Sequence, residues 1–113
     1  MQNINNLLEK YNNFVGDVLD NIEKTSETSY ILTISVQDDD GEEVNQVKLD
    51  FTDVQDSKIL VNSVLSYMDM MSGITLIKEN NLYGFAVGRG SAMLHVHNAP
   101  LYIVSSNINI IKD

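Results

Sequence analysis

Residues 30–51, YILTISVQDDDGEEVNQVKLDF, decide the fold. Both ends of this stretch, 30–37 and 44–51, are rich in β-branched and aromatic residues, and apolar and polar residues alternate in each of them. Alternation of this kind is typical of strands that bury one face and leave the other in water. Five acidic residues and one glycine separate the two ends, which favours a loop. The stretch therefore predicts a β-hairpin with an acidic tip.

Further strands are predicted after Gly73, where the apolar pattern becomes strand-like. Residues 74–79 and 82–87 read as a second hairpin, because the asparagine pair at 80 and 81 tolerates the positive φ of a tight turn. A turn through 88–90 leads to an expected strand over 92–97. Pro100 interrupts the pattern, and a last strand is expected over 101–105, with an extension over 108–111.

Two helices are expected, one before the first hairpin and one after it. From 4 to 22 the apolar residues recur at intervals of three and four, the spacing of a single helical stripe. Thr52 and Gln55 have the spacing of a capping box, and the second helix is expected to end at Gly73 in a left-handed conformation. The stripe of this second helix consists of Val54, Val61, Val64, Leu65, Met68 and Met71.

The end of the second expected helix is rich in methionine, a flexible side chain that fills irregular spaces. Met68 and Met71 lie on the apolar stripe and are expected in the core. Met70 and Tyr67 lie off the stripe, which makes them candidates for a contact surface.

These elements predict an α+β fold in a single domain that spans residues 1–113. Their order is α-β-β-α-β-β-β-β. Strands joined by short connections pair antiparallel, so we expect an antiparallel sheet of five to six strands with two helices on one face. A chain of this length buries one core and not two.

Charge is segregated along the chain. Thirteen of the sixteen acidic residues lie between Glu9 and Asp56, whereas the 22 residues from 90 to 111 contain no Asp, Glu, Lys or Arg. Soluble domains place charge wherever the surface meets water. The charge-free run is therefore either buried sheet or a surface that a partner covers.

Composition argues against several functional classes. The net charge of −9 argues against direct binding of nucleic acid, because phosphates require clustered Lys and Arg. The absence of cysteine excludes disulfides and thiolate catalysis. No apolar run reaches the roughly 20 residues of a membrane span, and no secretory signal is visible, so we expect a cytoplasmic protein of the producing or host cell. No catalytic motif appears either, which favours a protein without enzymatic activity or cofactor, and an enzyme centred on His95 and His97 stays open as an alternative.

The residues with the most distinctive chemistry lie in or beside the charge-free run. His95 and His97 are two apart on an expected strand and would project from the same face, but a metal needs further ligands, so no metal site is predicted. Arg89, the only arginine, lies in a glycine-flanked turn and is suited to holding a carboxylate or another anion. The candidate ligand or partner site consists of Arg89, His95, His97, Tyr83 and Tyr102.

Two functional hypotheses follow from these observations. The first is a small acidic interaction protein that self-associates through its uncharged C-terminal strands and binds a protein partner with a basic surface. An inhibitor or decoy encoded by a virus or mobile element is a sharper form of it, because thirteen asparagines and one arginine hint at an AT-rich genome. The alternative is a protein that binds a small anionic ligand or nucleotide with Arg89 and the face that carries His95 and His97.

Overall fold

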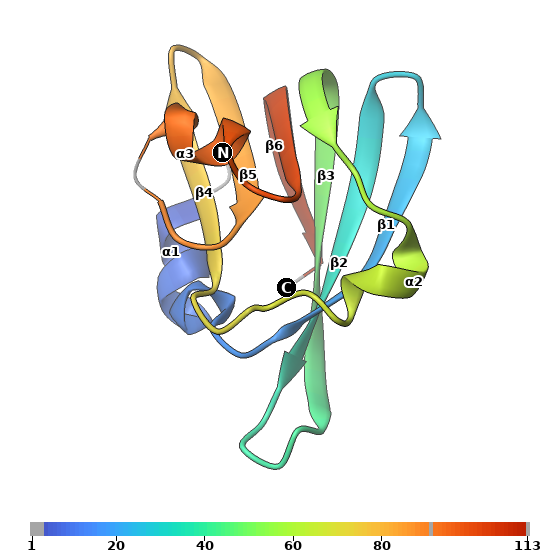
Figure 1. The fold of residues 1–113 in the computed structure, drawn as a ribbon, viewed down its shortest axis with the longest axis vertical. Helices are drawn as coiled ribbons and strands as arrows, with labels where there is room; N and C mark the ends of the chain where they lie inside the picture. The colour runs from blue at the N-terminus through green and yellow to red at the C-terminus, as the bar shows by residue number, and fades with distance from the viewer. Residues whose placement is uncertain (1–3, 91, 113) are drawn as a thin grey trace.

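The computed structural model describes residues 4–90 and 92–112, and the fold of these residues is α+β (Figure 1). Six strands form one antiparallel sheet, as predicted, and their order in the sheet is β1-β2-β3-β6-β5-β4. The strands are β1 Val18–Ser26, β2 Ser29–Gln37, β3 Glu43–Lys58, β4 Ile74–Glu79, β5 Leu82–Val87 and β6 Tyr102–Lys112. The helical segments are α1 Ile4–Lys10, the 3₁₀ turn η1 Asn12–Phe14, α2 Asn62–Leu65 and α3 Met93–His97.

Both predicted hairpins are confirmed. β2 and β3 pair antiparallel, and in the loop between them the carboxylate of Asp38 accepts hydrogen bonds from the backbone N–H groups of Asp40 and Glu42. β4 and β5 are joined by Asn80 and Asn81, which both have positive φ. Two consecutive residues of this kind match the twist of paired strands, which explains why asparagine occupies the turn.

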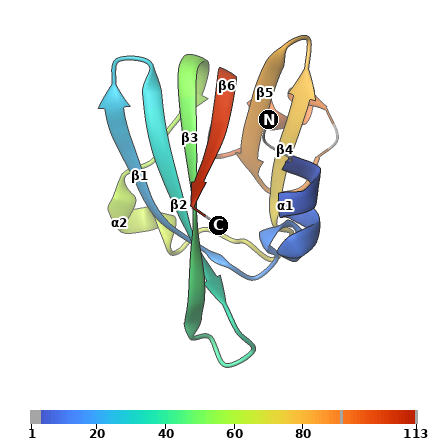
Figure 2. The ribbon, with the colours of Figure 1, turned by 180° about the vertical axis from the view of Figure 1, so that it is seen from behind.

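A bend shared by β3 and β6 folds the sheet over onto itself. Asp53 in β3 has φ of 53°, and the register between β3 and β6 is irregular between Val54 and Asp56. Figures 1 and 2 show β3 turning over near the top of each view. β5 pairs only with the first part of β6, from Tyr102 to Ser105. The sheet therefore forms two layers that are joined at the bend.

Polar side chains connect β3 to β6 at the bend. The amide of Asn107 donates to the Asp53 carboxylate over 3.2 Å, and the hydroxyl of the fully buried Ser105 donates to the carbonyl of Asn107 over 2.9 Å. The amide of Gln55 donates to the carbonyl of Asp53 over 3.2 Å. The first of these bonds joins the two strands, and the other two lie within β6 and within β3.

The main core lies between the two layers. The rings of Phe51 in β3 and Phe85 in β5 are 5.7 Å apart, which brings the layers into direct contact. Leu7 of α1 and Leu65 of α2 belong to the same core, so these two helices cover the same side of the sheet. α3 packs on the opposite face of β5, where Val96 meets Ala86. Two helices therefore share one face, roughly as predicted, and a third covers the other.

The helix predicted over 4–22 is wrong beyond Lys10. Asn12, Asn13 and Phe14 all have positive φ, which a right-handed helix cannot contain. The later part of the pattern belongs to β1, where a register shift around Asp20 leaves Leu19 and Ile22 both buried. A β-bulge adds one residue to a strand and so gives buried residues a spacing of three, as in a helix.

The helix predicted over 52–72 is also largely wrong. β3 continues through the supposed capping box to Lys58, and α2 contains only the four residues of Asn62–Leu65. Thr52 lies in the β3–β6 ladder, and Gln55 binds the carbonyl of Asp53 instead of capping a helix. Gly73 is left-handed as predicted, with φ of 77°, but it follows a turn instead of a long helix.

The strand predicted over 92–97 is a helix, α3. Met93 and Val96, three residues apart, pack over Gly84 of β5. A Cβ atom at residue 84 would lie 2.7 Å from the sulfur of Met93 and 3.1 Å from Val96 Cγ2. The missing side chain therefore gives α3 room to approach the sheet, which the local pattern around 92–97 does not reveal.

The loops that precede the two edge strands, β1 and β4, contact each other although they are distant in sequence. The backbone N–H of Gly16, before β1, donates to the carbonyl of Met70 over 2.8 Å. Gly73, before β4, lies so close to the first loop that a Cβ atom there would be 2.3 Å from the carbonyl oxygen of Asn13. The segments that precede the two edge strands are therefore in direct contact.

We predict that Gly73→Ala destabilises the protein much more than Gly41→Ala. Both glycines have positive φ, so each substitution strains the backbone by roughly 1–2 kcal/mol. Only at Gly73 does the new Cβ atom also collide with backbone, which adds about 2 kcal/mol or more, since nothing lies within 4 Å of a Cβ at Gly41. Urea unfolding of both variants measures the difference. Equal losses would contradict the close contact with Asn13.

A second prediction concerns Asp17, a buried carboxyl that accepts a hydrogen bond from the backbone N–H of Gln37 over 3.1 Å. Burial raises its pKa above the usual 3.8, and the bond from Gln37 offsets only part of this rise. The folded protein then holds the proton more tightly than the unfolded chain. Its contribution to stability is therefore lost as the pH rises from 3.8 through the raised pKa.

Asp17→Asn keeps an oxygen acceptor for Gln37 and removes the titration. The free energy of unfolding of Asp17→Asn should therefore rise relative to that of the original protein as the pH rises from about 3 to 7. Urea unfolding at a series of pH values measures it, with Asp39→Asn in the exposed hairpin loop as the control. A constant difference across this range would show that Asp17 titrates normally.

Candidate functional site

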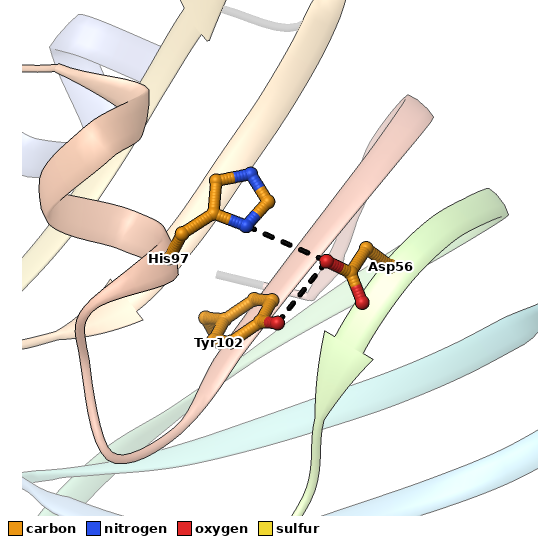
Figure 3. A network of polar contacts seen from close by, with 3 residues as sticks. All are labelled: Asp56, His97 and Tyr102. Atoms are coloured by element: carbon orange, nitrogen blue, oxygen red, sulfur yellow. Dashed lines mark hydrogen bonds and ion pairs between the residues drawn. The ribbon is translucent and has the colours of Figure 1, made fainter.

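A polar cluster joins α3 to the two central strands (Figure 3). One carboxylate oxygen of Asp56, near the end of β3, accepts a hydrogen bond from the Tyr102 hydroxyl over 3.1 Å. The same oxygen lies 3.4 Å from Nδ1 of His97, the last residue of α3. The imidazole ring also packs at an angle against the ring of Tyr102, with centroids 5.3 Å apart. The cluster thus combines a carboxylate, an imidazole and a phenol.

The start of α3 is held by a second carboxylate. Glu79, at the end of β4, accepts a hydrogen bond from the backbone N–H of Met93 over 3.1 Å. This bond satisfies one of the N–H groups that the first turn of a helix leaves without a partner. With Glu79 at one end and Asp56 at the other, α3 is attached to the sheet by polar contacts on both sides of its apolar contact with Gly84.

The groups of the cluster differ in their contact with water. The pKa of Tyr102 is raised by desolvation, and its hydrogen bond to Asp56 and the negative charge of Asp56 raise it further. Tyr102 therefore stays neutral at physiological pH, and its hydroxyl donates a hydrogen bond to the carboxylate. The side chains of His97 and Asp56 are 43% and 50% exposed. At this exposure water competes for both groups, so the contact between them is weak.

The structure separates the five predicted site residues into three places. His97 and Tyr102 meet at Asp56. Tyr83 packs against the main core on the opposite face of β5, where the Lys78 ammonium lies 5.3 Å from its ring centroid. Arg89 is exposed in the turn before α3, and His95 packs closely against the neighbouring Gly90.

The expectation that His95 and His97 share one face of a strand is therefore wrong. Both lie in α3, where residues two apart point in different directions. Asp56 was missed as a partner of His97, because it directly follows the Thr52 and Gln55 pair that predicted the start of a helix. Its position opposite Val104 in the β3–β6 ladder depends on the bend.

A second surface feature, which we call the α2 row, consists of exposed apolar side chains around α2. In this segment the backbone N–H of Val64 donates to the carbonyl of Val61, and that of Tyr67 donates to the carbonyl of Val64. Bonds between residues three apart place successive side chains directly above one another, as in a 3₁₀ helix. The α2 row consists of Val61, Val64 and Tyr67, which these bonds align, together with Met71, which is exposed four residues further along the chain.

The α2 row exists because the segment is apolar on two sides. Leu65 and Met70 are buried in the main core, whereas Tyr67 is 86% exposed and Met71 is 72% exposed. The expectation that Met71 belongs to the core and Met70 to a surface is therefore reversed. Tyr67 is exposed, as predicted. Val61 and Val64, expected on the buried stripe, point outward because the long helix does not form.

Burial accounts for one part of the charge-free run. The first part of β6 lies between β3 and β5, and Leu101, Ile103, Val104 and Ser105 are all buried. Val96 of α3 is also fully buried. Charged side chains in such positions would lose their hydration without compensation. Of the two explanations that the sequence allowed, buried sheet applies to this part of the run.

An open hollow of about 520 Å³ lies beside α1 and η1. Its walls are formed by Asn5, Leu8, Glu9, Asn12 and Asn13. The amide and carboxylate groups among them can exchange hydrogen bonds with a polar molecule. None of the predicted site residues lines this hollow.

Residues 4–90 and 92–112 contain no group of three or more His, Asp or Glu side chains placed to hold a metal ion. In the same part of the chain no helix has the length and apolar character needed to cross a membrane. Comparisons with protein-family models, with curated proteins and with solved structures gave no match to this chain.

We predict that Asp56→Asn lowers the pKa of Tyr102. The substitution removes the negative charge that opposes ionisation of the phenol, but the effect of desolvation remains, so the pKa should not fall fully to its usual value of 10.0. A pH titration of the ¹³C-labelled tyrosine rings by NMR measures the change. Asp39→Asn in the hairpin loop serves as the control. An unchanged Tyr102 titration in Asp56→Asn would show that the two groups do not interact in solution.

Proposed function

We propose that this protein is a small acidic interaction protein that acts without catalysis, by binding a protein partner through the α2 row. The observation that carries the proposal is the exposure of Tyr67 and Met71 next to the exposed valines at 61 and 64. Single exposed apolar residues are common on soluble proteins, but a contiguous group of large ones is typical of interaction sites.

The side chains of the α2 row are suited to recognition. Tyrosine contributes a large contact area with few rotatable bonds, and methionine adapts its shape to the surface that it meets. Tyr67 and Met71 lie before and after Met70 in the chain, and the carbonyl of Met70 accepts a hydrogen bond from the backbone N–H of Gly16. A row on such an anchored segment loses little conformational freedom when a partner binds.

The Asp56, His97 and Tyr102 cluster supports a structural role better than a catalytic one. Catalytic acids and bases are usually desolvated, so that their pKa values match the reaction. Asp56 and His97 are each about half exposed, and His97 is the member of the cluster through which α3 meets Asp56 and Tyr102 of the sheet. The geometry therefore favours binding over chemistry.

Self-association through the C-terminal strand is a second candidate. Beyond Ser105, β6 pairs with β3, while its pairing with β5 has ended. Ile111 is half exposed in this segment, which contains no charged residue before Lys112. An uncharged strand of this kind is suited to pairing with a second copy. Light scattering at tens of micromolar tests this candidate, which a monomeric mass would contradict.

We predict that the double substitution Tyr67→Ser and Met71→Ser abolishes the complex formed in the producing cell. Both side chains are largely exposed, so stability should change by less than about 1 kcal/mol while the apolar contact is lost. Native mass spectrometry of the tagged protein gives the mass and stoichiometry of the complex.

The matched control is Val44→Ser with Leu94→Ser. It removes two apolar side chains of 62% and 69% exposure that lie outside the α2 row, in β3 and α3. The control should retain the complex of the unmodified protein. Retention of the same complex by the Tyr67 and Met71 variant would contradict binding through the α2 row.

A further inference from the structure

The α2 row is too small to form a stable interface by itself. Four side chains expose at most several hundred Å², whereas a standard interface covers roughly 800 Å² on each partner. Any occupant of the row must therefore also cover the surface around it. The charges on that surface select the kind of partner that fits.

The surroundings of the α2 row are acidic. α2 is fixed to the edge strand β1 by the Asn62 side-chain oxygen, which accepts a hydrogen bond from the backbone N–H of Ile22 over 3.0 Å. On either side of Ile22, β1 exposes Asp20 and Glu23. At the other end of the row, the carboxylate of Asp69 accepts a hydrogen bond from the backbone N–H of Met71 over 2.9 Å.

Two basic residues belong to the same region, Lys24 of β1 and Lys58 at the end of β3. Against the three carboxylates of Asp20, Glu23 and Asp69, these two lysines leave the region with a net charge of −1. Two copies meeting through this row would bring together surfaces of the same sign. Like charges at an interface disfavour association, so a second copy is a poor occupant.

We infer that the α2 row binds a basic protein surface, in which apolar side chains are flanked by lysine or arginine. This inference rests on the proposed function and specifies the partner. The apolar side chains of the partner cover Val64, Tyr67 and Met71. The lysine or arginine side chains of the partner face Asp20, Glu23 and Asp69. The exposed ring of Tyr67 adds a face on which an arginine can stack.

Three synthetic helical peptides of equal length test the inference. One is amphipathic and built from leucine and lysine, one replaces each leucine by serine, and one replaces each lysine by glutamate. Their binding to the ¹⁵N-labelled full chain is followed by NMR in about 50 and 500 mM salt. Of the three peptides, we expect only the leucine–lysine peptide to change the amide chemical shifts of residues 61–71 and of Glu23. Its binding should be weaker at high salt.

Two variants separate local recognition from net charge. Asp20→Asn, Glu23→Gln and Asp69→Asn together neutralise the surroundings of the row, and asparagine at 69 keeps an acceptor for the Met71 N–H. Asp39→Asn, Asp40→Asn and Glu42→Gln remove the same number of charges from the hairpin loop. We expect the first variant to weaken binding by about five-fold or more and the second by less than about two-fold.

The remaining outcomes overturn the inference. Equal weakening by both variants would show attraction to net charge alone. Binding of the leucine–glutamate peptide would show that the row prefers an acidic partner. Chemical shifts at 61–71 that change with protein concentration, without peptide, would show that the row binds a second copy. In both cases the proposed function would survive. If no peptide shifts the row and the Tyr67 and Met71 variant retains the cellular complex, both the inference and the proposed function fail.

Discussion

The shared bend of β3 and β6 is the constraint on which the rest of the structure depends. A six-stranded sheet has two faces, and the short helices of this chain are too small to cover either one. The bend at Asp53 solves this problem, because it folds the sheet into two layers that bury each other. The contact between Phe51 and Phe85, and the bonds among Asp53, Ser105 and Asn107, follow from this geometry.

The bend also determines what reaches the surface. It places the first part of β6 between two strands, which explains why the sequence carries no charge there. It brings Asp56 beside Tyr102 and so creates the place where His97 attaches α3. It also extends β3 into the region where a helix was expected. The chain between Lys58 and Gly73 is left as short turns that bury Leu65 and expose Tyr67.

The sequence predicts those parts of the fold whose signals are local. The alternation around the acidic loop, and the asparagine pair before Leu82, specify the two hairpins because strand pairing and turn conformation depend on neighbouring residues. The α+β class and the antiparallel sheet follow from them. The candidate site was less predictable: His97 and Tyr102 were identified, but their common partner Asp56 becomes adjacent only through pairing between distant strands.

The helices and strands that were predicted wrongly from the sequence have identifiable physical causes. The bulge near Asp20 gives Leu19 and Ile22 the spacing of a helix, although they lie in a strand. The left-handed Asn12 and Asn13 end α1 where an apolar pattern continues. α3 forms where a strand was expected, and its packing requires the missing side chain of Gly84, nine residues before Met93 in sequence. The α2 row was obscured because an apolar stripe does not reveal which of its members the tertiary fold buries.

Most large apolar side chains of the folded sheet are buried, and we propose that the exposed side chains of the α2 row bind a partner. Hydroxyl-radical footprinting of Met70 and Met71 tests this claim most directly, because these adjacent residues differ from 4% to 72% in exposure. In the purified protein, Met71 should oxidise rapidly and Met70 slowly. In extract of the producing cell, Met71 and Tyr67 should become protected while Leu94 stays reactive. Equal reactivity of Met70 and Met71, or no protection of Met71 in the extract, would contradict the account.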